Sequence, residues 1–305
     1  MMYSIGVDIG GSHITSGMFE HMNKQLMKNT IVTLPVDNGA SKSEILSQWT
    51  EAIQRTMSIS GVAHVEGIGL AVPGPFDYYN GICLIKGVQK FDSLYEVNIR
   101  EELSSRLNLP GDKIRFINDA ASFSIGEAKF GEASTFRRCV AITLGTGFGS
   151  CFLIDGQPIV NGPNVPEQGV LYDKYFDGHM ADDLFSTRGL INSFNQLTGK
   201  KVDSVLDIYQ MAKENTTAYE VFKDFGSELG KFLKPHLSLF NAEVLILGGN
   251  ISKAFEYFGD KLQEQLPEIK ITVSKLNENA ALIGGVSLFE KGYYSELSTT
   301  LKLMN

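Results

Sequence analysis

The chain carries the same short pattern twice, and this repeat constrains the fold more than any other feature. Residues 7–19 read VDIGGSHITSGMF and residues 142–154 read ITLGTGFGSCFLI, so each copy is an apolar strand, a glycine turn and a second strand. Alternating strand-like and helix-like segments follow both copies. In a chain of 305 residues, such a repeat predicts two α/β domains of similar plan that face one another.

Short apolar runs predict the strands, and apolar residues at three- and four-residue spacing predict the helices. The predicted strands are residues 3–9, 14–19, 30–34, 67–72, 113–117, 139–144, 150–154, 243–247 and 269–273. The predicted helices are residues 41–57, a helix that begins at residue 120, and residues 219–240, 251–266 and 279–291. The segment Pro73-Gly74-Pro75 predicts a fixed turn after a buried strand, because two prolines around a glycine stop any regular element.

Composition and charge exclude several functional classes. Lys and Arg number 27 against 35 Asp and Glu, and the net charge of −8 disfavours nucleic acid as the main partner. Cys83, Cys139 and Cys151 lie far apart, which argues against a disulfide framework and a cysteine-rich zinc site and fits a reducing cytoplasm. The N-terminus lacks the pattern of a signal peptide, and no apolar run has membrane-spanning length. We therefore expect a soluble, cytoplasmic protein without a membrane partner.

Both glycine turns have the chemistry of a phosphate site. A strand that ends in Gly10-Gly11-Ser12 or in Gly145-Thr146-Gly147 brings backbone N–H groups and a hydroxyl close to a ligand. Neither turn is a P-loop, because no lysine follows it, and neither is a dinucleotide-binding turn, because a strand follows instead of a helix. One such turn is usually a plain hairpin, whereas two of the same kind, one in each half, favour a phosphate site.

Two acidic residues stand at the ends of predicted strands. Asp8 lies on an apolar strand, where a carboxylate is costly unless it is paired or near a cation. It is either a residue of an Asx-type turn or a group that supports a bound magnesium ion or phosphate indirectly. Asp119 ends a strand and starts a helix. It is equally well a helix N-cap or a carboxylate that takes a proton from a substrate hydroxyl at the ligand-binding edge of a sheet.

Five segments, in the same order along the chain, resemble the ROK family of repressors, open reading frames and sugar kinases. They are DIGGSH at 8–13, GIGLAVPGPFD at 67–77, FINDAASFSIGEAKFG at 116–131, ITLGTGFGS at 142–150 and LILGGNIS at 245–252. The ND pair and the LGTGxGS element are specific in combination. The resemblance covers most of the chain and implies the fold of actin, hexokinase and the Hsp70 ATPase, in which two ribonuclease H-like domains of duplicated plan face one another across a cleft.

The expected domain boundary lies beside the ND pair. We expect an N-terminal α/β domain of residues 1–118 and a larger C-terminal α/β domain of residues 119–305. A C-terminal helix at about 290–305 is expected to pack back on the N-terminal domain.

The resemblance also implies a function and the residues that perform it. A glucokinase-like sugar kinase uses ATP and Mg²⁺, and Asp119 would deprotonate the sugar hydroxyl that attacks the γ-phosphorus. Asp8 would hold Mg²⁺ through water. The implied nucleotide-binding residues are Asp8, Gly10, Gly11, Ser12, Gly145, Thr146, Gly147, Gly248 and Gly249. The implied sugar-binding residues are Asn118, Asp119, Glu167, Asp182, Gly74 and Pro75.

The region between residues 165 and 183 departs from the family pattern. Members commonly carry GEIGH followed by a CxCGxxGCxE zinc-binding stretch, whereas here Val170 replaces the histidine and the cysteines are absent. Asp182 stands where the family has a longer sugar-binding Glu, and His179 is expected to be a loop or packing histidine. We therefore expect no zinc site, and the changed donors put glucose itself in doubt as the substrate.

Two other functions remain as alternatives to the hexose kinase. A sugar-sensing transcription regulator of the family would carry a DNA-binding domain before the first strand, yet that strand begins at Tyr3. A non-catalytic sugar-binding relative would explain the altered region at 165–183. The substrate is expected to be a hexose or an N-acetylhexosamine, and the protein is expected to form a homodimer, to which the apolar helix 219–240 could contribute.

Overall fold

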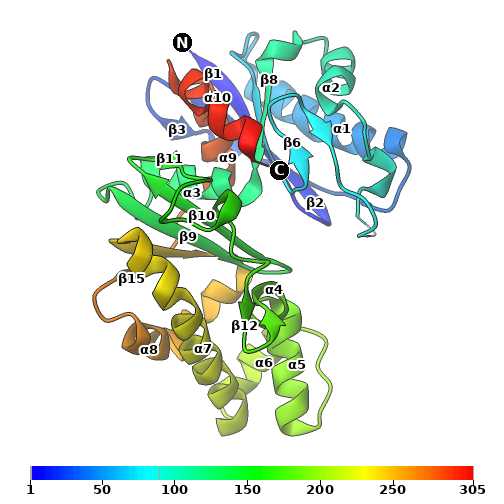
Figure 1. Ribbon diagram of the computed structural model, residues 1–305. Coiled ribbons are helices and arrows are strands. Elements are labelled where there is room, and N and C mark those ends of the chain that lie inside the picture. Colours follow the sequence, from blue (N-terminus) through cyan, green and yellow to red (C-terminus); the bar gives the residue numbers. More distant parts are fainter. Residues whose placement is uncertain (1, 89, 305) are drawn as a thin grey trace. The chain divides into compact units, whose positions relative to one another are not determined.

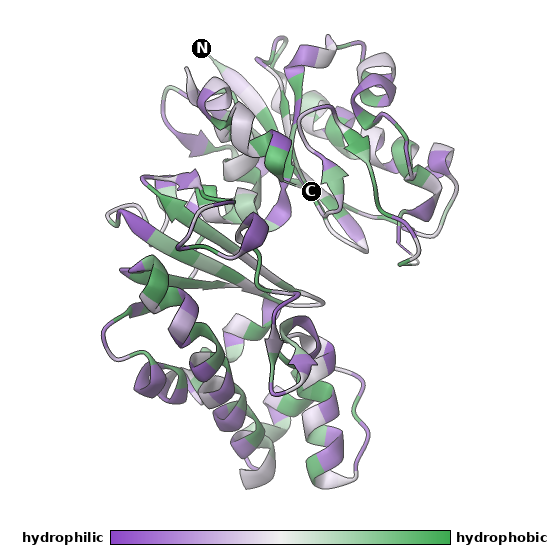
Figure 2. Ribbon diagram, viewed as in Figure 1, coloured by the Kyte–Doolittle hydropathy of each residue, from purple (hydrophilic) through white to green (hydrophobic). Residues whose placement is uncertain are grey.

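The computed structural model describes residues 2–88 and 90–304, which fold into two compact units (Figure 1). Unit 1 holds the residues up to Glu127 together with those from Glu278 onward, and unit 2 holds Ala128–Asn277. Within the described residues, no helix is long and apolar enough to cross a membrane. Hydrophobic residues concentrate on the central strands of both units, and the helices carry polar residues among apolar ones (Figure 2).

The sheet of unit 1 follows the order β3-β2-β1-β5-β8, and β4 pairs with β2. β1 and β2 are antiparallel, whereas β1, β5 and β8 are parallel. The strands are β1 (Tyr3–Ile9), β2 (His13–Glu20), β3 (Gln25–Leu26), β4 (Val32–Pro35), β5 (Ile68–Val72) and β8 (Ile114–Asn118). The parallel strands therefore bring their carboxyl ends, which carry the predicted site residues of this unit, to one edge of the sheet.

Helices cover both faces of this sheet. On β2 the Ser16 hydroxyl donates to the Ala52 carbonyl of α1 (Lys42–Ser60), while the next residue, Gly17, faces Leu282 of α9 (Asn279–Ser287). Because successive strand residues point to opposite faces, α1 and α9 lie on opposite sides of the sheet. The unit also contains α2 (Ile99–Leu107), α3 (Asp119–Phe130), α10 (Tyr293–Leu303) and the hairpin of β6 (Phe76–Asp77) and β7 (Ile82–Cys83).

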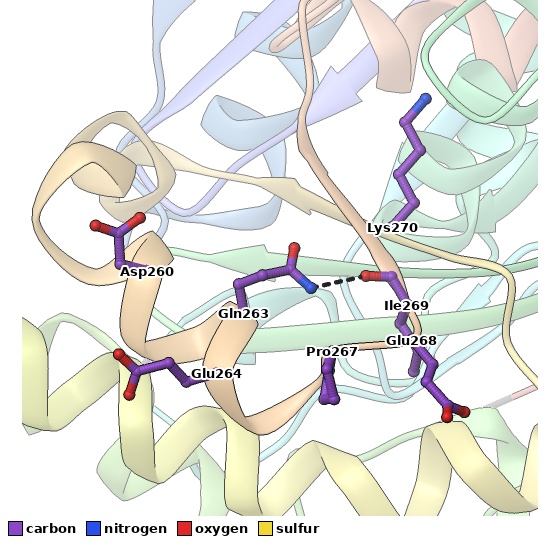
Figure 3. A pocket seen from close by; sticks show the side chains of 7 residues that line it. All are labelled: Asp260, Gln263, Glu264, Pro267, Glu268, Ile269 and Lys270. Carbon is purple, nitrogen blue, oxygen red and sulfur yellow. Dashed lines mark hydrogen bonds between the residues drawn. The ribbon is translucent and has the colours of Figure 1, made fainter.

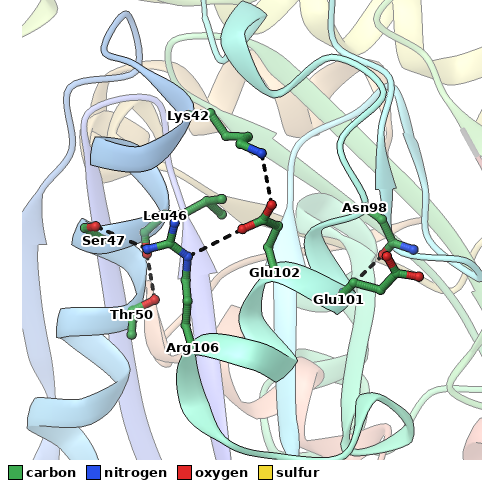
Figure 4. Close-up of polar contacts among 8 residues, drawn as sticks. All are labelled: Lys42, Leu46, Ser47, Thr50, Asn98, Glu101, Glu102 and Arg106. Carbon is green, nitrogen blue, oxygen red and sulfur yellow. Dashed lines mark hydrogen bonds and ion pairs between the residues drawn. The ribbon is translucent and has the colours of Figure 1, made fainter.

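A polar contact joins α1 to α2 on the surface of unit 1 (Figure 4). Glu102 accepts from Lys42 at 3.0 Å and pairs with Arg106 at 3.6 Å, and Arg106 also donates to the Ser47 hydroxyl at 3.3 Å. The ion pair between Lys42 and Glu102 lowers the pKa of that carboxyl. Because these groups are partly exposed, the network adds little to stability.

The sheet of unit 2 repeats the plan of unit 1. Its order is β11-β10-β9-β14-β15, with β9 and β10 antiparallel and β9, β14 and β15 parallel. The strands are β9 (Arg138–Leu144), β10 (Phe148–Ile154), β11 (Gln157–Pro158), β14 (Val244–Gly248) and β15 (Lys270–Val273). Five strands thus match β3-β2-β1-β5-β8 in order and direction, so the predicted duplication is confirmed at the level of topology.

Aromatic side chains fill the core of unit 2. Phe148, Phe185, Phe225 and Phe232 pack with ring centroids 5.2–6.0 Å apart, and the long helix α7 contributes two of these rings. The helices of this unit are α4 (Ala181–Leu184), α5 (Thr187–Thr198), α6 (Val205–Ala212), α7 (Thr216–Phe240) and α8 (Phe255–Gln265). A small hairpin consists of β12 (Tyr175–Phe176) and β13 (His179–Met180). The apolar face predicted at 219–240 is therefore largely core.

The division into units differs from the expected ranges 1–118 and 119–305. Backbone contact between helices explains the difference, since a Cβ on Gly284 would lie 1.8 Å from the Ser122 carbonyl and one on Gly126 would lie 2.1 Å from the Ala280 carbonyl. Such close approach ties α3, as far as Glu127, to α9 in unit 1. The chain accordingly returns to unit 1 at Glu278, earlier than the expected helix at about 290–305.

Candidate active site

Asp8 and the first glycine turn follow one another at the end of β1. The turn is closed by the Gly10 N–H, which donates to the His13 carbonyl at 2.9 Å, and leaves Ser12 exposed. Burial raises the pKa of Asp8 to about 7, and the negative charges of Asp119 and Glu278 add to the shift. Asp8 and Asp119, predicted separately from two distant motifs, therefore belong to one acidic group in unit 1.

Asn118, and not Asp119, performs the capping of α3. The side-chain oxygen of Asn118 accepts from the Ala121 N–H at 3.1 Å, the bond expected of an N-cap residue. Asp119 is the first helical residue, and its carboxylate accepts from the Ala120 N–H at 2.8 Å. Burial raises the pKa of Asp119, whereas the Ala120 amide and the Asn118 side chain favour the ionised form. Helix capping alone therefore does not account for a half-buried carboxylate at this position.

The Asn118 amide is also held from its other side. Its nitrogen donates to the Tyr78 hydroxyl at 3.2 Å, and that hydroxyl donates to the Val72 carbonyl at 3.3 Å. Tyr78 is fully buried, so Asn118 has one fixed orientation. Val72 pairs with Asn118 across β5 and β8, which places the turn that contains Gly74 and Pro75 next to the ND pair.

The two predicted nucleotide turns of unit 2 lie beside each other. Gly145-Thr146-Gly147 joins β9 to β10, and Gly248, the last residue of β14, pairs with Thr143 near the end of β9. Gly249 has a φ of 80°, and a Cβ there would lie 2.3 Å from the Leu144 carbonyl. This position therefore requires glycine, and the carboxyl ends of β9 and β14 expose backbone groups together.

Asp182 supports the turn between β9 and β10. One carboxylate oxygen accepts from the Phe148 N–H at 2.6 Å, and the other pairs with the Arg188 guanidinium. Thr187 donates to the Gly145 carbonyl through both its backbone N–H, at 2.8 Å, and its hydroxyl, at 2.9 Å. Both oxygens of Asp182 thus have protein partners, which limits its predicted contact with a sugar.

The rest of the altered region is more exposed. Glu167 is exposed in a short 3₁₀ turn at Glu167–Gly169, and His179 is exposed on β13. Among residues 2–88 and 90–304, no group of three or more His, Cys, Asp or Glu side chains is placed to hold a metal ion. Figure 3 shows a surface hollow of unit 2 between α8 and β15 that contains none of the predicted site residues. It is lined by Asp260, Gln263, Glu264, Pro267, Glu268, Ile269 and Lys270.

Sequence reasoning missed four residues that contact or influence the predicted site residues. Tyr78 orients Asn118, Arg188 pairs with Asp182, Glu278 raises the pKa of Asp8, and Lys90 lies beside Gly11. Only Tyr78 could have been suspected from the sequence, because it directly follows the PGPFD segment. The others reach the site from segments that carry no motif.

Two sheets of one topology, each with a glycine turn at the carboxyl end of a strand, and the acids at the same edge in unit 1 define a protein of the actin and hexokinase fold class. Within that class the chain belongs to the ROK family, whose model matches residues 4–291. The family predicted from the motifs is therefore confirmed.

Individual relatives are distant but align over nearly the whole chain. A glucokinase of Thermotoga maritima is 27% identical over an alignment of 322 residues, which covers 94% of this chain and 97% of the relative. An N-acetyl-D-glucosamine kinase of Haemophilus influenzae is 24% identical and covers 89% and 91% of the two chains. A ROK family glucokinase from Streptomyces griseus, solved in complex with glucose and AMPPNP, superposes with a TM-score of 0.74 at 20% identity, covering 95% of this chain and all of the other.

Proposed function

We propose that the protein is an ATP-dependent sugar kinase that phosphorylates a hydroxyl of a hexose or an N-acetylhexosamine. The observation that carries the proposal is Asp119, a half-buried carboxylate whose capping role is taken by Asn118 and whose charge acts on Asp8 beside the first glycine turn. Similarity to a glucokinase and to an N-acetyl-D-glucosamine kinase supports the substrate class.

Asp119 is the proposed general base. As the sugar hydroxyl oxygen forms its bond to the γ-phosphorus of ATP, the hydroxyl proton passes to the Asp119 carboxylate, the bond between the γ-phosphorus and the bridging oxygen breaks, and ADP leaves. The raised pKa makes this carboxylate a stronger proton acceptor, and the Ala120 amide keeps it aimed in one direction. Asn118, fixed by Tyr78, has an N–H group available to orient the sugar.

The glycine turns are the proposed nucleotide-binding elements. In unit 1, backbone N–H groups of Gly10-Gly11-Ser12 would donate to phosphate oxygens of the nucleotide. In unit 2, the N–H groups of Gly145-Thr146-Gly147 would likewise donate to phosphate oxygens, and Gly248-Gly249 would contact the adenosine. In unit 2, Asp182 and Thr187 hold the turn at Gly145 and Phe148 in shape before any ligand binds. Preorganised donors of this kind stabilise the charge on the transferred group.

Asp8 is the proposed Mg²⁺-binding residue. Two neighbouring acids oppose its ionisation, so a divalent cation would relieve a repulsion already present. A single carboxylate suits Mg²⁺, which keeps several waters and uses substrate phosphates as ligands. When bound, the cation would neutralise charge on the phosphate oxygens.

A pH titration of stability tests the environment of Asp8 without any activity assay. The folded-state pKa of about 7 lies above the ordinary value of 3.8, so between these values the folded chain keeps a proton that the unfolded chain has lost. The free energy of unfolding should therefore fall as pH rises from about 4 to 7, by at most about 1.4 kcal/mol per unit from this group. Asp8→Asn should flatten that fall, and the exposed-acid variant Asp112→Asn should retain it.

Magnesium should counteract the loss of stability at higher pH. MgCl₂ should raise the melting temperature of the wild-type protein more at pH 8 than at pH 5.5, because only the ionised carboxylate binds the cation. Equal pH slopes for the wild type and Asp8→Asn would contradict the assigned environment of Asp8.

A coupled ADP-release screen tests the function. The purified protein with MgATP is assayed against glucose, fructose, mannose, allose and the N-acetylhexosamines. We expect one or a few of these sugars to stimulate ADP release strongly over the sugar-free rate. A non-catalytic sugar-binding protein or a regulator of the family would bind a sugar in the same panel and release no ADP, and that result would remove the kinase proposal.

A further inference from the structure

A lysine from a segment without any motif lies beside the first glycine turn. The Lys90 ammonium is 3.7 Å from the point where a Cβ on Gly11 would sit, and the Asn38 side-chain nitrogen is 3.8 Å from the same point. Two nitrogen donors thus face the bare side of Gly11. The space that a side chain would have occupied at this position is lined by groups suited to an anion.

The segment that carries Lys90 is anchored to the turn. The Asn38 side-chain amide donates to the Gly11 carbonyl, and the Phe91 N–H donates to the Asn38 carbonyl at 2.8 Å. The Phe91 ring is buried and packs edge-on against Trp49 of α1, with centroids 5.7 Å apart. The residue that follows Lys90 is therefore held by a backbone hydrogen bond and by ring packing.

The Lys90 ammonium has no ion-pair partner in the part of the chain that the structure describes. Its side chain is exposed. The other groups around the turn are also suited to an anion: the Ser12 hydroxyl lies 3.3 Å from the His13 ring nitrogen, and that ring lies against Gly10. Hydroxyl, imidazole, amide and ammonium groups together surround a turn that has no lysine of its own.

We propose that Lys90 is a phosphate-binding residue, whose ammonium pairs with the terminal phosphate of a nucleoside triphosphate held at Gly10-Gly11-Ser12. The proposal rests on the proposed kinase function and adds a residue to it. A triphosphate carries several negative charges of its own, so a cation at this turn in addition to Mg²⁺ would stabilise it. A P-loop supplies this charge from the adjacent lysine, whereas here packing brings it from a distant segment.

Calorimetric titration of AMPPNP, ADP and AMP tests the role, with Mg²⁺ and with or without the sugar that the screen identifies. Lys90→Met should weaken AMPPNP binding about 10- to 100-fold, as expected for a lost charge-assisted hydrogen bond. AMP binding should change less than about twofold, because AMP lacks the terminal phosphate. Lys90→Arg should restore most of the AMPPNP affinity. Lys28→Met is the matched control, since Lys28 is also exposed and belongs to a segment at the opposite end of β2.

The outcomes separate the two proposals. If the wild type binds AMPPNP and Lys90→Met binds it equally well, the role of Lys90 is overturned and the kinase proposal stands. An equal loss of AMP and AMPPNP binding would also overturn it, because the defect would then not follow the terminal phosphate. If the wild type binds no nucleotide under either condition, the kinase proposal fails, and the role of Lys90 fails with it.

Discussion

Asp119→Asn should lower kcat about 10²- to 10⁴-fold on whichever sugar the protein accepts, the range expected when a positioned general base is lost. The asparagine side chain has nearly the same shape and can still accept the Ala120 N–H bond, so α3 should begin as before. It cannot take the hydroxyl proton. Affinity for AMPPNP should stay within a few-fold of the wild type, because the nucleotide is assigned to the glycine turns and Lys90.

The control for this variant is Asp112→Asn. Asp112 is exposed and precedes β8, whereas Asp119 follows β8, so the two acids lie at opposite ends of one strand. Asp112→Asn should keep the wild-type kcat. Turnover by Asp119→Asn at a near-normal rate would remove Asp119 from the role of base, and loss of AMPPNP binding in that variant would indicate a folding defect instead of lost chemistry.

Gly284→Ala should destabilise the protein by about 2–3 kcal/mol, a cost typical of an overpacked contact. Helix propensity alone predicts the opposite sign, since alanine in a helix interior is favoured over glycine by about 1 kcal/mol. The packing cost should outweigh the gain in helix propensity, because the added Cβ would lie 1.8 Å from the Ser122 carbonyl and would push α9 away from α3. Denaturant unfolding followed by circular dichroism measures the difference.

A matched glycine gives the reference for this substitution. A Cβ on Gly111 would meet only the flexible Arg100 side chain, at an ordinary 3.6 Å, and Gly111→Ala should change stability by less than about 0.5 kcal/mol. A Gly284→Ala protein that is as stable as the wild type would show that α9 and α3 are not in backbone contact.

Regular elements with a clear apolar period could be predicted from the sequence. The first strand matches β1 (Tyr3–Ile9), and the strand predicted at 139–144 differs from β9 (Arg138–Leu144) by one residue. The helix predicted at 41–57 is α1, which begins after the capping residue Ser41 and runs on to Ser60. Each of these has many core contacts that agree with its local pattern.

Elements without a strong pattern were missed or misjudged. The nine-residue helix α2 is too polar to show a long apolar stripe. The helix predicted at 251–266 begins with a 3₁₀ turn at Asn250–Ala254, and the one predicted at 279–291 ends at Ser287. Helix ends depend on local hydrogen bonds that periodicity does not report.

Some residues of the candidate site could also be predicted from the sequence, and others could not. Motifs identified Asp8, Asp119 and the glycine turns, because these residues combine an unusual polarity with the end of an apolar strand. Tertiary contacts alone reveal the rest: Tyr78 fixes Asn118 from the neighbouring turn, and Lys90 reaches Gly11 through Asn38. No local pattern marks such residues, because their roles depend on which segments pack together.

The most direct test of the account is the mass balance of phosphoryl transfer. ATP labelled at the γ-phosphate is incubated with the purified protein, Mg²⁺ and the sugar that most stimulates ADP release, and both products are quantified. The account predicts that labelled sugar phosphate and ADP appear in equal amounts, and that Asp119→Asn makes both at least about 100-fold more slowly. Formation of ADP with free labelled phosphate and no labelled sugar, or no turnover with any sugar of the panel, would contradict it.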